Sequence, residues 1–80
     1  MIMRIDMIEK YVIGRTLYPK RFRYNKESEP IIIDRVIRES IENKNGNRYI
    51  LYACESVIDN VKKQYEIRLD IDIFVWTLKI

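Results

Sequence analysis

The clearest hydrophobic pattern in the chain follows Ser28 and has the period of a helix. Four apolar residues recur at i, i+3, i+4 and i+8, on one stripe of a helix: Ile33, Val36, Ile37 and Ile41. Ser28 and Pro30 are typical of a helix start, because serine caps the first turn and proline lacks an N–H that would be unpaired there. Asn45-Gly46 is typical of the turn that follows a helix. The pattern predicts a helix over about residues 29–43.

From Arg48 the period of the pattern changes to two. Residues 48–57 are rich in aromatic and β-branched side chains, which favour a strand. Asp59-Asn60 then suits a two-residue hairpin turn, because both residues tolerate a positive φ angle. One short helical turn capped by Ser56 is the alternative. A second strand is expected over about residues 62–80.

The apolar pattern inside residues 62–80 changes parity near its end. Between Tyr65 and Val75 the apolar residues alternate, so they lie on one face of the strand. From Phe74 onward the residues of the other face are apolar too, so both faces of the strand need to be covered. A bulge is the alternative explanation. Because a single helix covers only one face, we predict a homodimer whose interface contains four C-terminal residues: Phe74, Trp76, Leu78 and Ile80.

The first eighteen residues fit both a helical stripe and a strand-like alternation. β-branched and aromatic residues favour a strand over residues 11–18. Taken together, the elements predict an α+β fold in one small domain of residues 1–80. Its expected order is β-α-β-β, with an antiparallel sheet packed on one helix.

Composition then narrows the chemistry. The 80 residues include one cysteine and no histidine, which excludes histidine-dependent catalytic triads and Cys/His metal sites. Glu66, Asp70 and Asp72 alternate along one strand and could hold Mg²⁺ for phosphodiester cleavage, but Arg68 lies among them and would neutralise the site. We therefore predict a protein that is not an enzyme and uses no cofactor and no metal. A metal-dependent nuclease is the third hypothesis for its function.

The chain has no apolar run approaching the roughly 18–20 residues of a membrane span. Lone Cys54 cannot form an internal disulfide, which suits a reducing compartment. A cytoplasmic protein without membrane contact is expected.

Positive charge is concentrated in residues 15–26. This segment carries a charge of +5 without any acid, whereas the rest of the chain has ten basic and twelve acidic residues. Guanidinium groups can pair with phosphates while bases stack on aromatic rings. The candidate binding residues are those that supply charge or rings: Arg15, Lys20, Arg21, Phe22, Arg23, Tyr24 and Lys26.

Two functions fit this segment. The first is a small non-catalytic binding module that contacts RNA or DNA through residues 15–26. The alternative is a small inhibitor or adaptor, of the kind that viruses and mobile elements encode, which uses the same segment on an acidic surface of a host protein.

Overall fold

The computed structural model describes residues 2–79, which form two antiparallel sheets and no helix. Strands make up 74% of the structure, so the predicted α+β class and its β-α-β-β order are wrong. None of the described residues belongs to a helix that could span a membrane. The strands follow one another in the order β1 (Ile2–Arg4), β2 (Asp6–Ile13), β3 (Thr16–Arg23), β4 (Ile31–Ile32), β5 (Arg35–Lys44), β6 (Asn47–Ile58), β7 (Val61–Asp70) and β8 (Val75–Lys79).

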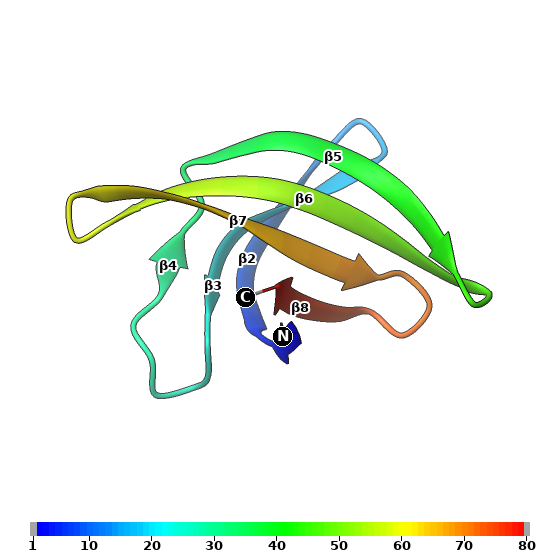
Figure 1. The fold of residues 1–80 in the computed structure, drawn as a ribbon, viewed down its shortest axis with the longest axis horizontal. Coiled ribbons are helices and arrows are strands. Elements are labelled where there is room, and N and C mark those ends of the chain that lie inside the picture. Colours follow the sequence, from blue (N-terminus) through cyan, green and yellow to red (C-terminus); the bar gives the residue numbers. More distant parts are fainter. Residues whose placement is uncertain (1, 80) are drawn as a thin grey trace.

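The two sheets are joined where the chain passes from one to the other. The larger sheet has the order β1-β8-β7-β6-β5, and the smaller one has the order β2-β3-β4. Between β1 and β2 the N–H of Ile5 donates to the carbonyl of Trp76 (3.1 Å). Between β4 and β5 the N–H of Ile33 donates to the carbonyl of Lys20 (2.9 Å). Figure 1 shows the long strands β5, β6 and β7 curving side by side.

The segment predicted as a helix, residues 29–43, forms β4 and most of β5. Its isoleucines and valine are β-branched, so they suit a strand as well as a helical stripe. Asn45 and Gly46 have φ angles of 52° and 81° and form the tight turn that pairs β5 with β6, instead of ending a helix. The register with β6 therefore overrides the helical spacing.

Two of the predicted strands contain turns. Residues 11–18 include Gly14, whose φ of 64° allows the turn between β2 and β3. Residues 62–80 divide into β7 and β8 at a turn over residues 71–74. This turn explains the change of parity near Phe74, where we expected either a two-faced strand or a bulge. The strand predicted over 48–57 lies within β6.

The core lies between the two sheets. Nine buried residues form it: Ile5, Phe22, Ile33, Tyr52, Cys54, Ile67, Leu69, Trp76 and Leu78. A hydroxyl pair is buried beside them, since the Ser56 hydroxyl lies 2.6 Å from both the Ile32 carbonyl and the Tyr65 hydroxyl. These contacts satisfy polar groups that burial would otherwise penalise.

Candidate functional site

The predicted basic segment does not form one surface. Arg15 lies in the turn after β2, four residues lie on β3, and Tyr24 and Lys26 follow β3 in a loop. The four on β3 are Lys20, Arg21, Phe22 and Arg23. The segment therefore runs the whole length of a hairpin strand, and its members have different surroundings.

Two of its arginines pair with acids of the neighbouring strand. Arg23 Nε lies 2.7 Å from the Asp6 carboxylate, and an Arg21 Nη lies 3.4 Å from that of Glu9. Asp6 and Glu9 stand opposite these arginines because β2 and β3 pair in this register. Arg21 and Arg23 thus offset the acids of β2 and are less available to a phosphate than the sequence suggested.

The two rings of the segment also differ. Phe22 is only 1% exposed and belongs to the core, whereas Tyr24 is 42% exposed and meets the Phe22 ring edge-on. Tyr24 lies at an apolar groove of about 460 Å³ that also contains Ile31 and Tyr65. This groove is at the end of β3 that lies farthest from the Gly14 turn, so Tyr24 is not grouped with Arg15.

Five aromatic rings form a row through the core, and the two end rings reach the surface and define a second candidate site. In order, the rings are Tyr11, Tyr18, Tyr52, Trp76 and Phe74, with centroid separations of 5.5, 6.4, 5.8 and 6.3 Å. The middle of this ring row is buried, with Tyr52 at 0% and Trp76 at 5% exposure. Its ends are accessible, with Tyr11 at 41% and Phe74 at 53%. The buried rings hold the exposed rings in place.

Hydrogen bonds fix the ring row to the strands around it. The Tyr18 hydroxyl donates to the Glu39 carboxylate at 2.8 Å, and this bond is the main cause that raises the pKa of Tyr18. The Tyr52 hydroxyl donates to the Leu17 carbonyl, and burial raises the pKa of Tyr52 strongly. Both phenols are therefore neutral at physiological pH and serve as packed, oriented rings.

A lysine lies against the exposed ring at each end of the ring row. Lys20 Nζ is 6.0 Å from the centroid of Tyr11, and Lys10 Nζ is 5.9 Å from that of Phe74. Both lysines are exposed, and both distances fall within the range of cation–π attraction. The structure thus twice presents an accessible ring with a positive charge next to it.

Unpaired positive charge is concentrated in the first third of the chain. Residues 2–26 contain seven basic and two acidic residues, and the later part contains eight basic and ten acidic ones. The two acids, Asp6 and Glu9, are the partners of Arg23 and Arg21. Within residues 2–79, the remaining basic groups on and beside β2 have no carboxylate within ion-pair distance: Arg4, Lys10, Arg15 and Lys20.

We call these four basic residues, with Tyr11 and Phe74, the β2 strip. A shallow groove of about 220 Å³ lies at one end of it, between β2 and the start of β8, and is lined by Arg4, Lys10, Phe74 and Trp76 among others. Lys20, Arg15 and Phe74 were singled out from the sequence, the last for another role. Arg4, Lys10 and Tyr11 were missed. Reading Gly14-Arg15 as a hairpin turn would have placed Lys10 and Tyr11 beside Tyr18 and Lys20.

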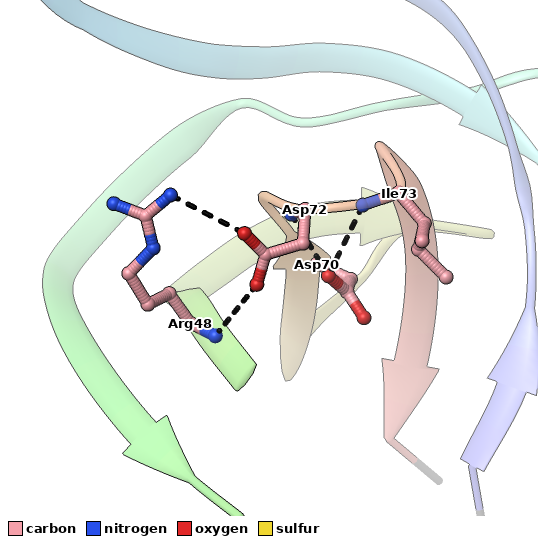
Figure 2. Close-up of polar contacts among 4 residues, drawn as sticks. All are labelled: Arg48, Asp70, Asp72 and Ile73. Atoms are coloured by element: carbon pink, nitrogen blue, oxygen red, sulfur yellow. Dashed lines mark hydrogen bonds and ion pairs between the residues drawn. The ribbon is translucent and has the colours of Figure 1, made fainter. Parts of the chain in front are cut away.

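The backbone of Phe74 has a strained conformation in the turn between β7 and β8. Its φ of 57° lies in the left-handed region, which bulky residues rarely adopt. Figure 2 shows how two carboxylates hold this turn. Asp70 accepts from the N–H groups of Asp72 (3.0 Å) and Ile73 (3.4 Å), and Asp72 accepts from the backbone N–H and the guanidinium of Arg48, both at 3.2 Å. These bonds keep the turn closed around Phe74.

Two of the three carboxylates considered for a metal ion, Asp70 and Asp72, are used in this turn, whereas Glu66 lies within β7. The bonds from Arg48 lower the pKa of Asp72, and Asp70 caps the backbone. Within the described residues no group of three or more potential ligands is arranged for a metal ion. Cys54, the one thiol, is buried, and its burial raises its pKa to about 12, which suppresses the thiolate.

The C-terminal residues predicted to form a dimer interface are divided by the fold. Trp76 and Leu78 are 5% and 6% exposed and pack in the core of their own chain, so the row does not need a second copy to cover it. Phe74 is exposed in the turn, and Ile80 lies outside the described residues. The structural reason for this interface is therefore removed, because the smaller sheet supplies the cover that a single helix could not.

Chemically, the β2 strip combines flat apolar rings with cations and lies next to a shallow groove. Such a surface can stack a planar group and attract an anion at the same time. Comparison of the chain with protein-family models, with curated proteins and with solved structures finds no match.

Proposed function

We propose that this protein is a non-catalytic module that binds single-stranded nucleic acid through the β2 strip. The observation that carries the proposal is the repeated pair of an exposed ring and a lysine, Tyr11 with Lys20 and Phe74 with Lys10. In each pair the flexible lysine can turn from the ring to a neighbouring phosphate, which leaves a face of the ring to a base. The two pairs are linked through one row of packed rings, which fixes their relative positions.

The energetics of such a surface come from stacking and from charge. A base stacked on an aromatic ring contributes about 1–3 kcal/mol and is tolerant of sequence, because every base has a π face. Arg4 and Arg15 extend the positive charge beyond the two rings. Binding is expected to be modest, sensitive to salt and weakly selective for sequence.

Single strands suit the β2 strip better than duplexes. Bases in a duplex are stacked on one another, so an exposed ring can reach them only after they unstack. Tyr11 lies on β2 and Phe74 in the turn between β7 and β8, and both rings are partly exposed, so an unstacked base can reach them. Comparing the affinities for oligothymidylate and oligouridylate measures whether the protein prefers DNA or RNA.

The first prediction concerns charge reversal on the β2 strip. Lys10→Glu with Lys20→Glu should weaken binding of a fluorescently labelled, unstructured oligothymidylate or oligouridylate by about tenfold or more, measured by fluorescence anisotropy, because two phosphate contacts become repulsive. For the wild type, four basic groups predict a slope of roughly −3 for log affinity against log salt concentration. The same sequence as a duplex should bind more weakly.

The matched control reverses two lysines elsewhere. Lys63→Glu with Lys79→Glu makes the same change in net charge on exposed residues at the Tyr24 groove. Affinity close to that of the wild type is expected for this control. Equal loss in both variants, tighter binding of the duplex, or no binding by the wild type would each contradict the proposal, and the last would favour an acidic protein partner for the β2 strip.

A further inference from the structure

The outer edge of β5 is open. β5 is the last strand of the larger sheet and pairs only with β6 within the described residues. In Figure 1 it runs along the upper border of the sheet. Its ten residues span roughly 33 Å, and an edge of this length presents a row of backbone N–H and C=O groups to any strand that can pair with it.

The side chains of this edge are charged, but the signs are mixed. Proteins often block an open edge with like charges, which repel a second copy. On β5 the basic Arg38 and the acidic Glu42 stand at equal distances from Ser40. These three residues share one face of the sheet, since they lie opposite Ala53, Leu51 and Tyr49 of β6.

We infer that β5 pairs antiparallel with β5 of a second copy of this chain, with a two-fold axis at Ser40. In this register Arg38 of each copy faces Glu42 of the other, which gives two opposite-charge pairs across the new strand boundary. The inference does not rest on the proposed nucleic-acid function.

The neighbouring registers are disfavoured by like charges. A shift of one residue in one direction puts Glu39 opposite Glu42, and a shift of two residues puts Arg38 opposite Lys44. In the other direction a shift of one residue puts Arg35 opposite Lys44, and a shift of two residues puts Glu39 opposite Glu39 of the second copy. Of these five registers, the one centred on Ser40 alone has opposite-charge pairs and no like-charge pair, so charge favours it over its immediate neighbours.

Exposed apolar surface on β5 supports the same pairing. Ile41 is 73% exposed and Ile37 is 43% exposed, although both belong to a strand of the main sheet. In the register centred on Ser40, Ile41 lies opposite Glu39 of the second copy, next to its aliphatic stem. The bulge at Ile37, between Val36 and Arg38, leaves the regular part of the edge at residues 38–44, where the axis lies.

Charge swapping tests the pairing in solution. Sedimentation velocity should show the wild type shifting from monomer to dimer as its concentration rises to high micromolar. Arg38→Glu and Glu42→Arg should each remain monomeric there, because each places like charges opposite each other. The double variant should recover the dimer. Neither side chain makes an ion pair within the described chain, so circular dichroism and the unfolding midpoint should stay close to those of the wild type.

A cysteine on the proposed axis tests the register. Ser40→Cys brings its own copy within about 4.5–5.5 Å between Cα atoms, inside the range that a disulfide requires, so mild oxidation should give a covalent dimer. Asn43→Cys is the matched control, since residue 43 faces residue 37 of the second copy and should stay reduced. Native Cys54 is fully buried and adds little background. A wild type that stays monomeric, single variants that still dimerise, or equal cross-linking of both cysteines would overturn the inference.

Discussion

Phe74 combines exposure, strain and a neighbouring charge in one residue. Its ring is 53% exposed with Lys10 beside it, and its φ of 57° costs about 1–2 kcal/mol for a residue that carries a Cβ. Glycine would remove this cost, and the turn would still be closed by Asp70 and Asp72. Strain that the surrounding structure tolerates is a reason to expect a functional ring at this position.

Replacing Phe74 by two small residues separates strain from function. Phe74→Gly should be more stable than Phe74→Ala by about 1 kcal/mol, because both lose the ring but only alanine keeps the unfavourable φ. Both variants should lose oligonucleotide affinity to the same extent, since stacking requires the ring. Urea unfolding and anisotropy measure the two effects. Equal stabilities would argue against the left-handed conformation, and unchanged affinity would remove Phe74 from the β2 strip.

At the scale of elements, the sequence predicted turns and strands unevenly. The strand over 48–57 and the Asp59-Asn60 turn could be predicted because both signals are local, and both turn residues have positive φ angles of 52° and 64°. β5 could not be predicted, because the apolar residues in it and just before it fit the stripe of a helix: Ile33, Val36, Ile37 and Ile41. Only the pairing with β6 makes this segment a strand. Asn45-Gly46 was ambiguous for the same reason, since this pair both ends helices and closes hairpins.

The Tyr52 hydroxyl is one of those that connect the two sheets, and its removal tests their packing. Tyr52 of β6 is fully buried and donates to the Leu17 carbonyl of β3. Tyr52→Phe should keep the stacked ring against Trp76 but lower the free energy of unfolding by about 1 kcal/mol, because the carbonyl loses its partner. Denaturant unfolding measures the change. A variant as stable as the wild type would show that this bond does not hold the sheets together.

At the scale of the whole molecule, the candidate site joins segments that lie far apart in the sequence. Lys10 and Tyr11 belong to β2, whereas Phe74 lies at the β7–β8 turn, and the ring row between them passes through Tyr18, Tyr52 and Trp76. The local excess of positive charge was visible in the sequence. The distribution of this charge over the surface was not visible, because Arg21 and Arg23 are neutralised by acids of another strand. The register of the β2–β3 hairpin places these acids opposite the two arginines.

Mapping of amide chemical shifts during an oligonucleotide titration tests the central claim most directly. In ¹H–¹⁵N spectra of the wild type, addition of oligouridylate should produce saturable changes that are largest at Lys10, Tyr11, Arg15, Lys20 and Phe74, and these changes should be lost in the Lys10→Glu, Lys20→Glu variant. Changes that cluster at the Tyr24 groove or along β5, or a spectrum that stays unchanged at saturating oligonucleotide, would contradict binding of nucleic acid by the β2 strip.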